Sequence, residues 1–470
     1  MVKTFRPPKK QRKPNRQHQA SLPVLELDIQ SLDHEGQGVV REHKPVVFVD
    51  GGLPGERCRV ALTEQKKNFS KGKVVEVLSA HPERQKPFCR HFGECGGCQT
   101  QYIGHAAMMQ LKQQAVSGLL QKLANITDDT SEHWQPAISD KGTGYRRKAR
   151  LAVDFRDDAH RKVGFRGKGS NNVVAIDECP VLQAGLQALL SPIRELCEQL
   201  DAKSAIGHID LLQGDQRVNG LVEVTDPLVV FRVTRNLSDQ DRQRLVNFAQ
   251  QNACQLVLEV RPGEYESLDG QRIDEGAYIH YALPNDVQLQ VGSNDFMQVN
   301  ASVNWKMVET ALLWLELEAS DKVLDLFCGL GNFSLPIARH VAHVTGMEGV
   351  PEMVQRAQQN ALRNGIQNID FICKDLEQPE TLHYWRKLDI NKVILDPSRP
   401  GAKEMMSRIL ELSPEKVLYV SCNPATFGRD IAELVGVAGQ GKYRLDKIAL
   451  LDMFPYTAHT ELISLFVRQG

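Results

Sequence analysis

The stretch VLDLFCGLGNFSLPIA, residues 323–338, decides the fold. An apolar run breaks at a glycine turn, and a second apolar segment with helical spacing follows. Gly329 and Gly331 allow the backbone to approach a ligand closely, and the start of the predicted helix leaves its first N–H groups free. This order of strand, glycine turn and helix predicts the ligand-binding edge of an open α/β sheet.

The rest of the C-terminal part repeats the alternation of strand and helix. From about residue 300, apolar runs predict strands between helical segments: KVLDLF, HVTGME, NIDFIC, KVILD, KVLYV, YRLDKIALLDM and ELISLFV. Such alternation is typical of an open, mostly parallel sheet. The last two runs predict a terminal β-pair.

Two kinds of cofactor fit the glycine turn. Glu348 ends the next strand, where a carboxylate can accept both hydroxyls of a ribose. A dinucleotide site requires G-x-G-x-x-G, and Ser334 stands at the last position here, so a nicotinamide enzyme is a weak match. Asp325 is similar to an acid of class I methyltransferases that helps to hold the methionine end of S-adenosylmethionine. Asp375 follows the next strand, where such folds meet the adenine.

Two reactive side chains follow two further strands. Asp396 ends a strand in ILDPSRPGA and Cys422 ends the next one in YVSCNPATF, so a parallel sheet brings both to the cofactor edge. A buried core cysteine is the ordinary alternative, but the polar residues Ser421 and Asn423 flank this thiol. Its thiolate would be a strong nucleophile.

A thiolate beside a methyl donor indicates pyrimidine chemistry. Carbon 5 of a pyrimidine is too weak a nucleophile to attack a sulfonium, but addition of a thiolate to carbon 6 gives carbon 5 enolate character. After methyl transfer a base must remove the proton of carbon 5 so that the thiol can leave. PYTAHTELIS, residues 455–464, offers Glu461 and His459, and desolvation would raise the pKa of Glu461.

Composition bounds the remaining possibilities. The chain has 470 residues, 41% of them apolar and 24% charged, with a net charge of −1. This composition predicts a globular protein of about two to four domains. No apolar run approaches the roughly 20 residues of a membrane helix, and we expect no secretory signal. The expected compartment is therefore a reducing cytoplasm, where the ten cysteines would not form a disulfide framework.

The N-terminal part indicates contact with nucleic acid. Residues 1–20 carry seven cations and no acid, which predicts a disordered tail that is either only solubilising or binds a polyanion. Residues 21–82 contain about five short β runs and predict a small OB-type barrel. Residues 145–150 add a basic strand, either a solvated sheet face or an RNA contact. Lysines near one turn of the barrel favour a phosphate-facing surface: Lys66, Lys67, Lys71 and Lys73.

Four cysteines form a separate pattern. Cys89, Cys95 and Cys98 follow C-x5-C-x2-C in CRHFGECGGC, and Cys179 stands in DECPVL. Four thiols can close a zinc or an iron–sulfur site. A spacing of five is unusual for zinc, so the pattern favours a [4Fe–4S] cluster, with zinc as the alternative.

Five motifs together resemble the RNA uracil-5 methyltransferases over nearly the whole chain: LDLFCGLGNFSLPIA, LDPSRPGA, SCNPATFGRD, NDFMQVNASVN and FPYTAHTE. The resemblance implies that Cys422 is the nucleophile and Glu461 the base. Tyr456 and Ala458 stand where relatives often have His and Gly, which concerns the positioning of Glu461 and not its identity. The resemblance also implies six residues that bind S-adenosylmethionine: Gln298, Phe327, Asn332, Glu348, Asp375 and Asp396.

The resemblance extends to the substrate. The cysteine motif is similar to that of the ribosomal-RNA branch of the family, and residues 21–82 resemble a TRAM domain. These likenesses imply methylation of 23S ribosomal RNA at uridine 1939, in a single-stranded loop with the uridine flipped out. They also imply a structural [4Fe–4S] cluster. Uridine 747, a transfer-RNA uridine, a cytosine and a non-catalytic RNA-binding assembly factor are the alternatives.

The predicted organisation therefore has four parts. A basic tail (1–20) precedes a TRAM/OB-like barrel (21–82). A central α+β domain that binds RNA and carries the cysteine cluster follows (83–290). The C-terminal part is a class I S-adenosylmethionine-dependent methyltransferase domain with a Rossmann-like α/β fold (291–470). The helical segment HAAMMQLKQQAVSGLLQKLA of the central part is a candidate to pack on the catalytic domain, and no membrane partner is expected.

Overall fold

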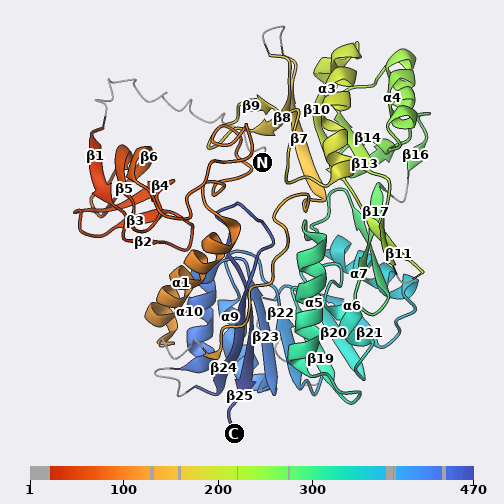
Figure 1. Cartoon of the computed structure of the whole chain (residues 1–470). Coiled ribbons are helices and arrows are strands. Elements are labelled where there is room, and N and C mark those ends of the chain that lie inside the picture. The colour runs from red at the N-terminus through yellow and green to blue at the C-terminus, as the bar shows by residue number, and fades with distance from the viewer. Residues whose placement is uncertain are drawn as a thin grey trace, which may run out of the picture. The chain divides into compact units, whose positions relative to one another are not determined.

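The structure, a computed structural model, describes residues 22–126, 132–156, 160–219, 221–273, 276–376, 385, 388–436 and 441–470 (Figure 1). The predicted basic tail lies outside these residues. The chain forms two compact units: the smaller ends at Pro82, and the larger runs from Glu83 to Gly470 and includes Asp33–Gly36. Within the described ranges no helix combines the length and the apolar character needed to cross a membrane.

The smaller unit contains a six-stranded sheet in the order β1-β5-β6-β4-β3-β2. Buried residues alternate with more exposed ones along β4 and the first half of β5, as expected for strands with one face toward a core. Gly72 in β6 is required because a Cβ there would lie 2.4 Å from the Val60 side chain. The strands are β1 (Val24–Asp28), β2 (Ser31–Leu32), β3 (Gly38–Val40), β4 (Val46–Asp50), β5 (Arg57–Gln65) and β6 (Phe69–Ser79).

The N-terminal half of the larger unit is built on an eight-stranded sheet in the order β16-β15-β14-β13-β10-β7-β8-β9. The basic strand β7 (Lys148–Asp154) lies inside this sheet, between β8 and β10. The other elements are β8 (Lys162–Arg166), β9 (Val173–Ala175), β10 (Ile206–Leu212), β13 (Leu228–Val233), β14 (Gln255–Arg261), β15 (Glu264–Glu266), β16 (Arg272–Ile273), α2 (Ala184–Ala188), α3 (Leu190–Gln199) and α4 (Asp239–Gln251). Two hairpins stand apart from it: β11 (Asp215–Val218) with β12 (Leu221–Val224), and β17 (Tyr278–Leu283) with β18 (Val287–Gly292).

The C-terminal half contains a seven-stranded sheet in the order β21-β20-β19-β22-β23-β25-β24. The first five strands in this order are parallel, and β25 runs antiparallel between β23 and β24. The terminal β-pair is therefore present as predicted. The strands are β19 (Lys322–Leu326), β20 (His343–Glu348), β21 (Ile369–Cys373), β22 (Lys392–Leu395), β23 (Lys416–Ser421), β24 (Tyr443–Leu451) and β25 (Glu461–Arg468).

Helices cover both faces of this sheet (Figure 1). One hydrophobic core joins the sheet to α5 (Ala301–Leu315), α6 (Ser334–Ala338) and α7 (Pro351–Arg363). A second core joins the other face to α9 (Lys403–Leu412), α10 (Pro424–Val435) and α1 (His105–Ala124). Helix α1 comes from the N-terminal half of the larger unit. It packs on the seven-stranded sheet, and its residues Val116 and Leu120 are buried in that second core.

Candidate active site

A cavity of about 540 Å³ lies at the edge of the seven-stranded sheet where its parallel strands end. Its walls come from the ends of β19, β20, β22 and β23, from the start of β25 and from residues 296–298. The parallel direction of the strands explains why these segments meet at one edge. Seven of the eight predicted catalytic and cofactor-binding residues line the cavity: Gln298, Phe327, Asn332, Glu348, Asp396, Cys422 and Glu461.

The glycine turn after β19 forms one wall. Phe327, Gly329 and Gly331 have φ angles of 62°, 56° and 93°, in the left-handed region that favours glycine. At Gly331 a Cβ would meet the Leu335 side chain at 2.9 Å, so the turn leaves no room for a larger residue. Glu348 holds the turn: its Oε2 accepts the N–H of Gly329 at 3.2 Å.

Asn332 is tied to the opposite wall. Its side-chain amide exchanges two hydrogen bonds of 3.0 Å with the amide of Asn304 in α5, and its Oδ1 also accepts the hydroxyl of Tyr281 at 3.4 Å. The guanidinium of Arg147 in turn lies over the ring of Tyr281, with 4.1 Å between its Cζ atom and the ring centre. These contacts give the polar end of the cavity a fixed shape.

Two acids do not line the cavity as the sequence suggested. Asp325 is buried beneath the glycine turn, accepts the hydroxyl of Ser334, and leaves its Oδ1 without a hydrogen-bond partner. Burial raises the pKa of Asp325 to about 7. Its expected contact with the methionine end of the donor stays a prediction. Asp375 is exposed just after β21 and also lies outside the lining.

The two predicted catalytic residues lie near each other because of the strand register. Ser421, the last residue of β23, pairs with Leu462 of antiparallel β25, so Cys422 directly follows one member of this pair and Glu461 directly precedes the other. Both residues line the cavity. Burial, followed by repulsion from Asp396, raises the pKa of Glu461 to about 8. Burial and then the charge of Glu461 raise the pKa of Cys422 to about 11. Burial also raises the pKa of Asp396 to about 7.

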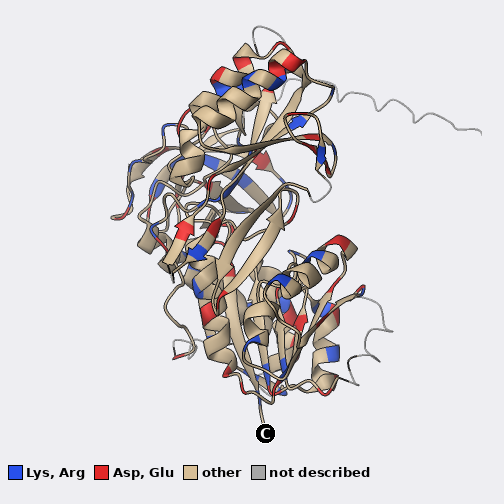
Figure 2. Ribbon diagram, turned by 90° about the vertical axis from the view of Figure 1, so that its right-hand side faces the viewer, with Lys and Arg blue, Asp and Glu red and all other residues tan. Residues whose placement is uncertain are grey.

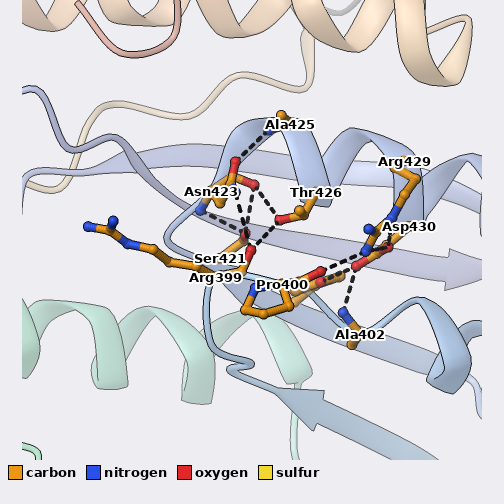
Figure 3. Close-up of polar contacts among 10 residues, drawn as sticks. Arg399, Pro400, Ala402, Ser421, Asn423, Ala425, Thr426, Arg429 and Asp430 are labelled. Atoms are coloured by element: carbon orange, nitrogen blue, oxygen red, sulfur yellow. Dashed lines mark hydrogen bonds and ion pairs between the residues drawn. The ribbon is translucent and has the colours of Figure 1, made fainter. Parts of the chain in front are cut away.

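A hydrogen-bond network joins the loops of Asp396 and Cys422 (Figure 3). Asn423 caps α10 by accepting the N–H of Ala425 at 3.0 Å, and its Nδ2 donates to the carbonyl of Arg399 at 3.2 Å. The hydroxyl of Thr426 donates to the same carbonyl at 3.1 Å. In Figure 3 the Arg399 side chain points away from this network, and its Nη2 reaches Nδ1 of His459 at 3.2 Å.

The contact with Arg399 decides between the two candidate bases. A guanidinium only donates hydrogen bonds, so Nδ1 of His459 must accept, and a neutral ring then carries its proton on Nε2. Burial and the charge of Arg399 lower the pKa of His459, which keeps the ring neutral. His459 in this state has no free lone pair for a substrate proton. Glu461 is therefore the better candidate for the base.

The four cysteines line a second cavity of about 460 Å³. Cys98 is close enough to the other three for their charges to raise its pKa, and burial raises it most, to about 12. Sulfurs around a single zinc would lie about 3.8 Å apart, given a Zn–S bond of about 2.3 Å. Within the described ranges, no group of three or more His, Cys, Asp or Glu side chains is arranged to hold a single metal ion. The four cysteine side chains that line this cavity are thiols.

The basic strand is largely turned inward. Arg147 is 1% exposed, donates from Nε to the carbonyl of Gln298 at 2.9 Å and pairs with Asp215. Lys148 donates to the carbonyl of Asp295 at 2.8 Å. The prediction that this strand contacts RNA is therefore wrong for these two cations, which hold residues 295–298 instead. These two cations are turned inward because β7 lies inside an eight-stranded sheet. Along the whole chain, basic and acidic residues are interspersed (Figure 2).

Three residues of the site are missing from the sequence prediction. Arg399 stands in the quoted motif LDPSRPGA, three positions after Asp396, so its signal was present. Lys112 occupies the buried stripe of α1, between Met108 and Val116, where the helical period predicts an apolar residue. Tyr281 carries no local signal, because only the fold brings β17 to the cavity.

Comparison with known proteins decides the family. The family model described as tRNA (Uracil-5-)-methyltransferase matches residues 108–469, which is most of the chain. The chain belongs to this family. A TRAM domain model matches residues 23–75. The protein thus combines an S-adenosylmethionine-dependent methyltransferase fold with an N-terminal TRAM domain of strands, and both predictions are confirmed.

Relatives of this uracil-5 methyltransferase match over nearly the full length. The 23S rRNA (uracil(1939)-C(5))-methyltransferase RlmD of Aeromonas hydrophila is 38% identical over 470 residues, 100% of both chains. RlmD of Vibrio cholerae is 40% identical over 445 residues, 94% of this chain and 96% of its own. The crystal structure of the Pyrococcus abyssi tRNA (uracil-54, C5)-methyltransferase in complex with S-adenosyl-L-homocysteine shares the fold, with a TM-score of 0.68 at 23% identity, over 94% of this chain and 100% of that one.

Proposed function

We propose that the protein transfers a methyl group from S-adenosylmethionine to C5 of uridine 1939 in 23S ribosomal RNA. The single observation that carries the chemistry is that Cys422 and Glu461 face one cavity from adjacent strands, next to a glycine turn. The relatives that carry this name cover almost all of the chain at 38% and 40% identity. They support the choice of RNA and of nucleotide.

The cavity suits a positively charged methyl donor. Asp396, Glu461 and Cys422 are acidic groups whose pKa values are raised by burial, so each would gain from a nearby cation. A sulfonium group placed beside them supplies that charge and lowers their pKa values. Gln298, Phe327, Asn332, Glu348 and Asp396 would hold the donor, and Asp375 would join them at the adenine end.

The methyl transfer begins with the thiol of Cys422. The thiol first loses its proton to solvent. The sulfur then adds to C6 of the uracil, a C6–S bond forms, and the electron pair of the C5–C6 double bond moves into an enolate. C5 then attacks the methyl carbon of the sulfonium, the bond from that carbon to sulfur breaks, and S-adenosylhomocysteine leaves. Arg399 favours the thiolate because its charge lowers the pKa of Cys422.

Glu461 completes the cycle. Its carboxylate removes the proton from C5, the C5–C6 double bond forms again, and the sulfur of Cys422 leaves C6 as thiolate. The base must lie within hydrogen-bond reach of that proton. The pairing of Ser421 with Leu462, which places Cys422 and Glu461 at the same edge of the sheet, supports this geometry. A pKa of about 8 makes the carboxylate a stronger base than an exposed glutamate.

We also propose that the second cavity holds an iron–sulfur cluster. Cys89, Cys95, Cys98 and Cys179 supply four thiols, and the N–H of Gly97 points at the sulfur of Cys95 at 3.4 Å, as is common around cluster sulfurs. The [4Fe–4S] group would supply a rigid link between distant segments. The methyl transfer requires no electron transfer, so this role is structural.

The RNA must present the uridine out of its stack. A cavity that ends in a thiol between strand ends admits only an extruded base, and single-stranded loops allow this most easily. The TRAM domain, with Lys66 and Lys71 beside Phe69, would hold the flanking backbone. Modification of ribosomal RNA belongs in the cytoplasm, which is the compartment that the sequence analysis expects.

Mapping 5-methyluridine in ribosomal RNA tests the function. We expect position 1939 of 23S RNA to lose its methyl group in cells without this protein and to regain it on expression of the intact chain. Expression of the Cys422→Ala variant is the control and should not restore the methyl group. Unchanged methylation at position 1939 without the protein would contradict the proposal.

A further inference from the structure

The segment that leads into Glu461 is held from outside its own sheet. Residues 456–459 lie in the connection between the end of β24 at Leu451 and the start of β25 at Glu461. The N–H groups of Gln99 and Thr100 both donate to the carbonyl of Tyr456, at 2.8 and 3.0 Å. The N–H of Ala458 donates to Oε1 of Gln99 at 3.2 Å. This support comes from the two residues that directly follow Cys98.

A buried lysine holds two further carbonyls of this segment. Nζ of Lys112 donates to the carbonyl of Thr457 at 3.0 Å and to that of His459 at 2.6 Å. Lys112 is only 4% exposed, and a buried ammonium is unfavourable unless it is hydrogen-bonded. Its bonds therefore fix the segment and α1 to each other. Four consecutive residues before the base-bearing strand are thus bonded to the N-terminal half of the chain.

We propose that Gln99, Thr100 and Lys112 form a loop clamp that positions Glu461 for proton removal. This inference rests on the proposed function. Pairing with β23 fixes β25 from Leu462 onward. Glu461 is the first residue of that strand and is held on one side by its pairing with Leu451 of β24, so the preceding segment also determines where its carboxylate lies. A displacement of about 1 Å in such a group can cost about a hundredfold in rate.

The charge of Lys112 adds a second effect. Lys112 lowers the pKa of Glu461, and so does Arg399, whereas burial, Asp396 and Asp452 raise it. The other titratable groups that face Glu461 and Lys112 are Cys422, His459 and the His105 partner of Asp452. Removal of the Lys112 charge therefore raises the pKa of Glu461 further, and the base then becomes active only at a higher pH.

A single-turnover experiment on Lys112→Met in the full chain tests the clamp. Transfer of labelled methyl into the covalent RNA–protein adduct is followed separately from release of methylated RNA. We expect release to slow about tenfold or more, with a smaller change in methyl transfer, and the pH profile of release to move to higher pH. Lys122→Met, on the exposed last turn of the same helix, is the matched control and should behave as wild type.

Two results would overturn the proposal. In the first, both steps slow by the same factor together with a loss of thermal stability, as a merely structural lysine would cause. In the second, neither rate nor the pH profile of release changes. Gln99→Leu provides an independent variant if Lys112→Met does not fold, because it removes only the acceptor for Ala458 and the side-chain bond to Gly96.

Hydrogen exchange separates the clamp from the methyl-transfer function. We expect the amides of residues 456–461 to exchange faster in Lys112→Met than in wild type and in Lys122→Met, without RNA or methyl donor. Inactivity of wild type would contradict the proposed function and leave this measurement valid. Unchanged exchange in an active enzyme would contradict the clamp alone.

Discussion

The two cavities of the larger unit place thiols in opposite electrostatic surroundings. Carboxyl groups of Asp396 and Glu461 dominate around Cys422, with Arg399 as the nearby cation. Burial raises the pKa of thiols in both cavities, so burial alone does not set their chemistry. Carboxylates favour a cationic ligand such as a sulfonium, whereas arginines favour an anionic assembly such as thiolates around iron. The charged side chains that line the second cavity are mostly arginines, with one acid: Arg146, Arg150, Arg166 and Glu178.

Replacing the reactive thiol should have the largest effect. Cys422→Ala removes the atom that bonds to C6, so we expect product and covalent adduct to fall by about four orders of magnitude or more. Methyl donor binding should change little, because the glycine turn is untouched, and equilibrium dialysis would measure it. Cys254→Ala, outside both cavities, is the matched control. Residual turnover near the wild-type rate would exclude a nucleophilic role for Cys422.

Replacing the base should block a later step. Glu461→Gln keeps the shape of the side chain but cannot accept the C5 proton, so turnover should fall about 10²- to 10⁴-fold. The covalent RNA–protein adduct should accumulate on a denaturing gel because the sulfur cannot leave. Asp452, a carboxylate near Glu461 that lies outside the lining of the cavity, cannot replace it. Normal turnover of Glu461→Gln would show that another group is the base.

The raised pKa of Glu461 predicts the pH dependence of product release. The base acts only when ionised, and its pKa is raised to about 8, so activity is lost as the pH falls through about 8. Release should rise about tenfold from pH 7 to pH 9, since the ionised fraction rises from roughly a tenth to nine tenths. Release of methylated RNA in single turnovers measures this step. A rate that stays flat over this range would contradict a base with a raised pKa.

Replacing a cysteine of the second cavity should lower the iron content more than it lowers the rate of the methyl transfer. Cys98→Ser removes one proposed ligand, so iron per chain in anaerobically purified protein should fall well below the wild-type value. The amides of residues 456–459 should exchange faster, because Gln99 and Thr100 follow this ligand. Adduct formation at Cys422 should decrease less than in Cys422→Ala. Iron-free wild-type protein would contradict the cluster.

Many residues of the candidate active site could be predicted from the sequence, because they lie at the ends of predicted strands. Asp396 and Cys422 each follow an apolar run, and parallel strands necessarily bring such ends together. The closeness of Cys422 and Glu461 could not be predicted in this way, since it depends on the antiparallel register of β25. The inward position of Arg147 could not be predicted, because a cation in a strand gives no sign of its tertiary partners, here Gln298 and Asp215.

Mass analysis of the adduct that Glu461→Gln accumulates tests the central claim most directly. After nuclease and protease digestion, we predict one linked species, in which the peptide containing Cys422 carries uridine 1939 with the methyl group already attached. That composition requires sulfur addition and methyl transfer before proton removal. A link at another residue, or an adduct without the methyl group, would contradict the account.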